Sequence, residues 1–174
     1  MKQRITSRSA LTRLTIAAVF MALTIALCSF SIPVPGGHLY LCDIAICTAA
    51  LLLDPFSAFV VGGVGAFLGD LIFYPLPMFV SLATHGLQAV AIALFARYVF
   101  KKKPKIASVL GLSLGLVILV TGYSLGRAFL YATPEYAILK LPYEILQGLI
   151  GAVLGYLLYW KTPLRKIYQN MIQN

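Results

Sequence analysis

The sequence has few charged residues, because Asp, Glu, Lys and Arg make up 11% of its 174 positions, whereas soluble domains average about 25%. Acidic residues are the scarcest, with 5 against 14 basic ones, and hydrophobic residues reach 60%. This composition excludes water as the main solvent and indicates a protein embedded in a bilayer. The basic residues form short clusters beside apolar segments rather than one charged face. They therefore indicate contact with anionic lipid headgroups, not nucleic acid.

Motifs for catalysis and energy conversion are also lacking. No nucleophile–base pair and no phosphate-binding loop is found, and the glycines of 62–70 lie inside an apolar run rather than after a strand. Cys28, Cys42 and Cys47 have neither metal-site nor redox spacing, and we expect buried thiols. We therefore expect no catalytic residue, no cofactor and no metal in this chain. Energy for any transport must come from partner proteins.

Apolar runs separated by Pro, Gly and Lys-rich breaks predict an all-α integral membrane protein in which residues 1–174 form one domain. The six expected transmembrane helices lie near 11–32, 41–53, 56–74, 77–100, 106–127 and 140–160. With the N-terminus inside, twelve of the fourteen basic residues fall in inner segments, which predicts that both termini are cytoplasmic. These twelve are Lys2, Arg4, Arg8, Arg13, Arg97, Lys101, Lys102, Lys103, Lys105, Lys161, Arg165 and Lys166.

The second predicted helix, 41–53, is short for a membrane span, because about 13 residues cover only ~20 Å of a hydrocarbon core of ~30 Å. The preceding segment, 33–41, is too rich in Pro and Gly to be helical. Irregular backbone at membrane depth is tolerated where it is buried or lines a cavity. The segment is therefore interpreted as a lid or wall of an outward-facing pocket, and a plain surface loop remains the alternative.

Polar side chains are distributed unevenly along the predicted helices. Those in the outer half are Asp43, Asp70, His85, Gln88, Arg127, Glu144 and Gln147. A self-driven transporter would need polar groups continuing across the midplane, and the inner half has almost none. The pattern instead predicts a cavity that opens outward above a closed apolar floor.

Several of these groups have a structural alternative. Asp43 could cap the second helix, and Asp70 could be a paired structural carboxylate. Arg127 and Glu144 could pair with each other, and Lys140 could extend to the outer interface.

Small residues recur at helical spacing in three segments, where they allow close helix approach. For Ala58, Gly62 and Ala66, and for Gly151 and Gly155, we expect internal packing. The first helix has such a face at Ala18, Ala22 and Ala26. For this face, internal packing and a docking surface for another subunit both remain open.

The segment 36–77 and the motifs THGLQAVAIAL (84–94), GYSLGRAFLY (122–131) and PYEILQGLIGAVLG (142–155) resemble the S components of energy-coupling-factor (ECF) vitamin importers, in the group that contains riboflavin, hydroxymethylpyrimidine and pyridoxine carriers. The resemblance implies a multi-pass protein of the bacterial cell membrane with an S-component bundle. It also implies that the alanine face docks onto a transmembrane coupling subunit (T component). Two partner ATPases would use ATP while the S component topples in the membrane.

The predicted substrate-binding residues, chosen from the polar groups at one depth and their neighbours, are Asp70, Tyr74, Thr84, His85, Gln88, Tyr123, Arg127, Glu144 and Gln147. The implied lid is formed by Gly36, Gly37, His38, Leu39 and Tyr40. The sequence departs from the usual pattern of the group at His85, Arg127 and Glu144, which leaves a pyridoxine-like and a hydroxymethylpyrimidine-like ligand both open. Two other classes remain as alternatives: a small intramembrane enzyme or accessory protein that uses these same three residues, and an autonomous facilitator or channel.

Overall fold

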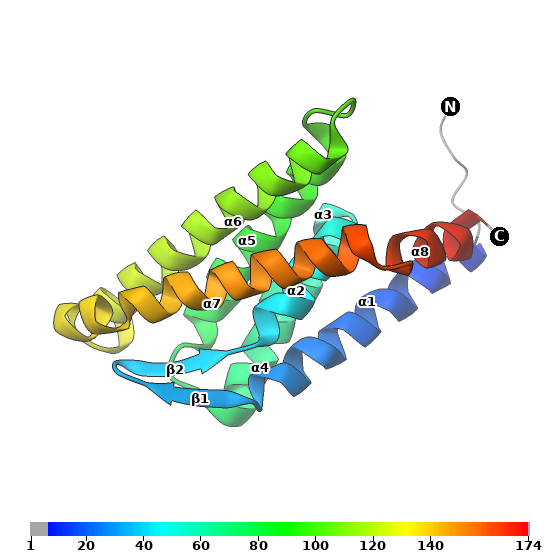
Figure 1. The fold of residues 1–174 in the computed structure, drawn as a ribbon. Helices are drawn as coiled ribbons and strands as arrows, with labels where there is room; N and C mark the ends of the chain where they lie inside the picture. Colours follow the sequence, from blue (N-terminus) through cyan, green and yellow to red (C-terminus); the bar gives the residue numbers. More distant parts are fainter. Residues whose placement is uncertain (1–6, 174) are drawn as a thin grey trace.

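The computed structural model describes residues 7–173, so the basic residues Lys2 and Arg4 lie outside it. It is a helical bundle in which the two ends of the described chain lie together and a β-hairpin lies at the opposite end (Figure 1). We call these the terminal end and the hairpin end. The elements in chain order are α1 (Ser7–Cys28), β1 (Ser31–Val34), β2 (Gly37–Tyr40), α2 (Cys42–Leu52), α3 (Pro55–Phe59), the π-helical η1 (Val60–Val64), α4 (Gly65–Phe73), α5 (Met78–Tyr98), α6 (Pro104–Gly126), the π-helical η2 (Arg127–Tyr131), α7 (Pro134–Lys161) and α8 (Leu164–Gln173).

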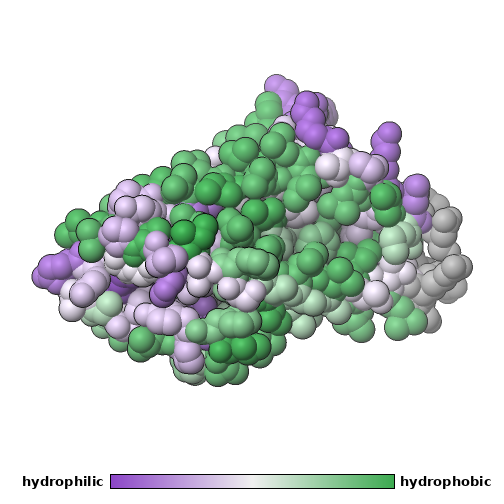
Figure 2. Space-filling model, turned by 60° about the horizontal axis from the view of Figure 1, so that its bottom comes forward, coloured by the Kyte–Doolittle hydropathy of each residue, from purple (hydrophilic) through white to green (hydrophobic). Residues whose placement is uncertain are grey.

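In the described part of the chain, five segments are long and apolar enough to cross a membrane: α1, the continuous α3–η1–α4, α5, α6–η2 and α7. The sixth, α2, has eleven residues, of which ten are buried. It packs among α1, α5 and α7. Its neighbours therefore separate it from lipid, and a helix of about 16 Å suffices because the hairpin continues the same path. The surface over the middle of the bundle is largely hydrophobic, and the strongly hydrophilic residues lie toward the ends (Figure 2).

The segment expected to be non-helical is an antiparallel hairpin, with Ser31 opposite Tyr40 and Val34 opposite Gly37. Because Ser31–Val34 form a strand, α1 ends at Cys28 and not near residue 32. Gly36 in the turn has φ of +81°, and a Cβ there would lie 2.9 Å from Cβ of Lys140 on α7. Glycine is thus required both by the turn conformation and by the close approach of the hairpin to α7.

The C-terminal part of the chain differs most from expectation. Helix α7 begins at Pro134, six residues before the predicted start, and continues through Pro142. Pro134 lies in the first turn, where its missing N–H is not needed, so it starts the helix rather than breaking it. Helix α8 was not predicted, because Leu164–Gln173 is too polar and too short for a span. It packs on α1 at the terminal end.

The small-residue faces separate into two kinds. Ala58, Gly62 and Ala66 are buried, and a Cβ on Gly62 would lie 2.8 Å from Cβ of Ala89 on α5. Gly151 and Gly155 contact Asp43 and Cys47 on α2. Internal packing is therefore confirmed for both of these faces. By contrast, the alanine face of α1 is exposed along its length, at Ala18, Ala22 and Ala26.

Candidate ligand-binding cavity

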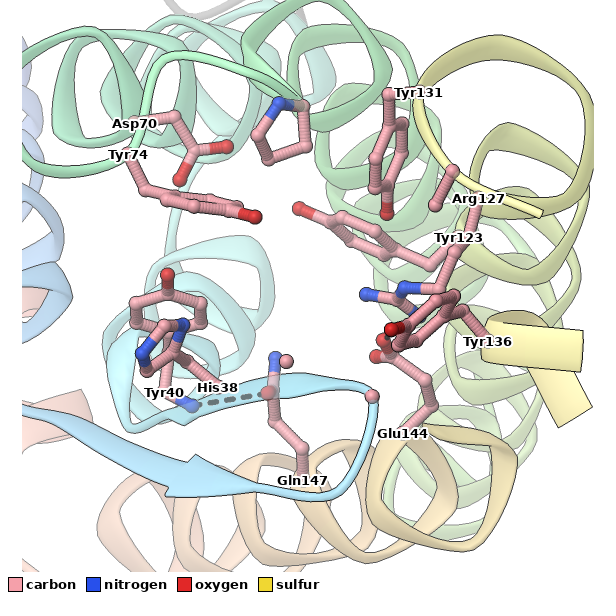
Figure 3. A pocket seen from close by; sticks show the side chains of 14 residues that line it. His38, Tyr40, Asp70, Tyr74, Tyr123, Arg127, Tyr131, Tyr136, Glu144 and Gln147 are labelled. Carbon is pink, nitrogen blue, oxygen red and sulfur yellow. Dashed lines mark hydrogen bonds and ion pairs between the residues drawn. The ribbon is translucent and has the colours of Figure 1, made fainter. Parts of the chain in front are cut away.

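A cavity of about 300 Å³ lies at the hairpin end, enclosed by the hairpin, the α4–α5 connection, α6–η2 and α7 (Figure 3). This volume is at the lower end of the range for small-molecule pockets, ~300–1,000 Å³, and suits a single-ring ligand. The lining residues are Gly36, Gly37, His38, Tyr40, Asp70, Tyr74, Pro77, Tyr123, Arg127, Tyr131, Ala132, Tyr136, Glu144 and Gln147.

Aromatic side chains form much of the wall. Five tyrosines and His38 surround the space, and the His38 and Tyr74 rings meet edge to face with centroids 5.6 Å apart. Aromatic faces and edges contact a flat ring over a large apolar area while their hydroxyl groups remain available for hydrogen bonds. Burial raises the pKa of Tyr40 on β2, as does the nearby Asp70 carboxylate, so this phenol stays protonated. The wall therefore fits a ring that has polar substituents.

Three charged side chains form a buried cluster on one side of the cavity. Oε1 of Glu144 lies 2.8 Å from Nη1 of Arg127 and 3.3 Å from Nζ of Lys140. Lys140 is 1% exposed, which rules out the alternative that it extends to the interface; the hairpin turn covers it. Arg127 and Glu144 do pair with each other, as the structural alternative stated, and both also line the cavity. The cluster has two cations and one carboxylate and therefore carries one excess positive charge.

Asp70 lies across the cavity from this cluster (Figure 3). The hydroxyl of Ser81 donates a hydrogen bond to its Oδ2 and also contacts the hydroxyl of Tyr123. Asp70 is thus a paired carboxylate and a lining residue at once. With Asp70 on one side and Arg127 on the other, the cavity wall presents charges of both signs, which favours a neutral or zwitterionic ligand because an unpaired buried charge is costly.

A second polar layer lies behind the cavity wall. Asp43 accepts hydrogen bonds from Nε2 of Gln88 at 3.0 Å and from Nε2 of Gln147 at 2.8 Å, and Nδ1 of His85 donates to Oε1 of Gln88 at 2.8 Å. Oε1 of Gln147 accepts the Tyr40 backbone N–H at 3.0 Å. Asp43 is therefore not the cap of α2; it orients Gln147, which in turn holds β2.

This layer changes the role of three expected contacts. His85 and Gln88 are absent from the cavity wall and belong to the Asp43 network, and Thr84 packs against Gly122 of α6. Leu39 is also absent from the wall, since alternate residues of a strand point to opposite faces. The other expected substrate-binding and lid residues line the cavity.

Two lining groups are buried without a hydrogen-bond partner among the described residues: Nδ1 of His38 and the hydroxyl of Tyr131. Such groups are costly unless a ligand or water pairs with them. Tyr131 and Tyr136 were missed from the sequence because 128–139 was interpreted as a connecting loop. The tyrosines on either side of Pro134 were the signal that could have identified them.

Residues 8–166 match the family model described as "ECF-type riboflavin transporter, S component". The chain is 34% identical over 148 residues to "Thiamine precursor transporter HmpT" of Lactococcus lactis subsp. cremoris (strain MG1363). The aligned region covers 82% of this chain and 82% of that relative. It is 31% identical over 136 residues to an "Uncharacterized protein in gap 3'region" of Pyrococcus woesei, covering 77% of this chain and 89% of that relative.

Proposed function

Because the chain belongs to the S components of ECF-type transporters, and is thus a multi-pass transporter subunit rather than an enzyme, we propose that it captures a single-ring vitamin or vitamin precursor in the hairpin-end cavity. The observation that carries the proposal is the wall itself. Within about 300 Å³ it combines tyrosines, charges of both signs and two unpaired polar groups. Such a site binds a flat, polar, uncharged or zwitterionic ring.

We propose the hydroxymethylpyrimidine class as the ligand. A thiamine-precursor transporter is among the similar proteins, and a pyrimidine offers ring nitrogens and an amine to the unpaired His38 and Tyr131. Pyridoxine, also one ring with hydroxyl groups, is the second candidate. A fused three-ring ligand such as riboflavin needs more space than this cavity supplies.

The proposed transport cycle depends on partners. The alanine face of α1 is exposed and carries no large side chains at Ala18, Ala22 and Ala26, which suits close docking of helices from a T component. Two ATPases would consume ATP, and the S component would topple to deliver its ligand. The basic residues at the terminal end support a cytoplasmic position for that end.

Calorimetry on the purified protein tests the ligand. Hydroxymethylpyrimidine should bind more tightly than pyridoxine, and riboflavin should not bind. Tyr131→Phe should weaken binding about 2- to 10-fold, the effect of one lost hydrogen bond. It should not lower the stability of the ligand-free protein, because the hydroxyl has no hydrogen-bond partner among the described residues. Tyr98→Phe, at an exposed position far from the cavity, is the control. Riboflavin as the tightest ligand, or an unchanged affinity for Tyr131→Phe, would contradict the assignment.

Ligand binding should also slow hydrogen exchange in the hairpin. The hairpin closes one side of the cavity and is held to α7 through Gln147 and the turn at Gly36. A ligand that contacts His38 and Tyr40 adds to these contacts, so the amides of residues 31–40 should exchange more slowly when ligand is bound. Amides of α8, at the other end of the bundle, provide the internal control. Equal exchange in the hairpin with and without ligand would rule out its role as a lid.

A further inference from the structure

A second polar cavity, of about 320 Å³, lies at the terminal end of the bundle. It is lined by the last turns of α2, α5 and α7 and by α8, which follows α7 at the terminal end (Figure 1). It is therefore at the opposite end from the ligand cavity and shares no lining residue with it. The lining residues are Leu51, Leu52, Ala96, Arg97, Tyr159, Arg165, Tyr168 and Gln169.

Both arginines of this cavity are held by groups that do not neutralise them. Arg97 donates from Nε to the Leu53 carbonyl at 2.9 Å and from Nη2 to the Leu52 carbonyl, where α2 ends. The Arg165 guanidinium lies over the Trp160 ring, 4.5 Å from its centroid. Carbonyl oxygens and aromatic faces orient a guanidinium while leaving its positive charge in place.

The cavity has more positive than negative charge. Among residues 9–172, whose side chains the structure describes, no carboxylate lies within ion-pair distance of Arg97 or Arg165. Asp54 is near enough to interact with Arg97, but it already accepts the N–H of Ser57 at 3.1 Å and its hydroxyl at 2.8 Å. Burial acts to raise the pKa of Asp54, but the hydrogen bonds from Ser57 outweigh it and lower that pKa below its usual value. Asp54 is therefore ionised, and its negative charge offsets one of the two arginines.

Three of the residues that line the cavity carry further hydrogen-bond donors. Nε of Arg165 is buried and has no partner among the described residues. Burial raises the pKa of Tyr168 despite nearby Arg97 and Arg13, so its hydroxyl remains protonated and can donate. The Gln169 amide is at the exposed rim. A guanidinium, a phenol and an amide around one space match an anion with several oxygen acceptors.

We propose that this cavity binds the phosphate group of an anionic phospholipid, with Arg165 and Arg97 as the charged contacts and Tyr168 as a further donor. The location carries the choice of a lipid, because the cavity lies at the basic end of a bundle whose middle is covered by apolar residues (Figure 2). Ile167 and Met171 of α8 are exposed beside it and offer acyl chains an apolar surface. Basic pockets between helix ends are typical binding sites for anionic headgroups.

The test measures thermal unfolding of the detergent-purified full chain with dioleoyl phosphatidylglycerol, dioleoyl phosphatidylcholine or inorganic phosphate. Phosphatidylglycerol should raise the wild-type midpoint by about 3 °C more than phosphatidylcholine, because a ligand that binds the folded state stabilises it. Arg165→Gln should lose this difference. Lys166→Gln, which removes the same charge from the next, exposed position of α8, should keep it.

A second pair of variants avoids any loss of the Arg165–Trp160 contact. Gln169→Glu places a carboxylate at the cavity rim and should abolish the phosphatidylglycerol effect, whereas Asn170→Asp, with the same added charge at a neighbouring exposed site, should retain it. If both variants of a matched pair lost the phosphatidylglycerol effect equally, general surface charge would explain the effect. That result would overturn the proposed site. Stabilisation by inorganic phosphate to the same extent as by phosphatidylglycerol would overturn the assignment to a lipid.

Discussion

Glu144→Gln is expected to weaken ligand binding about 10- to 100-fold, as expected for a lost buried hydrogen bond to a charged group, and to lower the free energy of unfolding by about 3–5 kcal/mol. Glu144 is the carboxylate that both Arg127 and Lys140 contact, and all three side chains are buried. A glutamine in its place leaves two adjacent buried cations without an anion. Calorimetry for the ligand and denaturant unfolding in detergent measure the two effects.

A double-mutant cycle separates the charge effect from simple loss of packing. Lys140→Met removes one cation while the Arg127–Glu144 pair remains, so it should cost less stability than Glu144→Gln. The double variant restores the excess of one positive charge found in the wild type and should be more stable than Glu144→Gln alone. If the double variant lost as much free energy of unfolding as the two single variants together, the three groups would not act as one charge cluster.

Ala22→Trp is expected to abolish ATP-dependent uptake and co-purification with a T component while the affinity for the ligand changes less than about twofold. Ala22 is exposed in the middle of the alanine face of α1 and does not line the ligand cavity. An indole there would hold a docked helix away, because close approach depends on small residues. Uptake by proteoliposomes that contain the complete ECF module, and binding by the isolated chain, measure the two properties.

The matched control for this experiment is Ala83→Trp on α5, where an alanine is also exposed but lies outside the alanine face. It should retain uptake. Loss of ligand binding in Ala22→Trp would show that α1 supports the cavity rather than a partner. Full transport by the wild-type chain without ATPases would show that no partner is required.

Features that depend on local composition could be predicted from the sequence. Hydropathy located the membrane segments, because each span must be apolar whatever it packs against. Pro and Gly in 33–41 excluded a helix there, and the structure has a hairpin. Depth along a helix follows from residue number at 1.5 Å per residue. Asp70, Arg127, Glu144 and Gln147 could therefore be assigned to one level of the bundle, and all four line the cavity.

What the tertiary structure decided is the direction in which each side chain points and what covers it. His85 and Gln88 are at the expected depth, but the rotation of α5 directs them toward Asp43, behind the cavity wall. Lys140 is buried because the turn at Gly36, a hundred residues earlier in the chain, lies on it. The rotation of a helix and the burial of a side chain under another segment result from packing between segments distant in sequence. The local pattern of residues does not specify this packing.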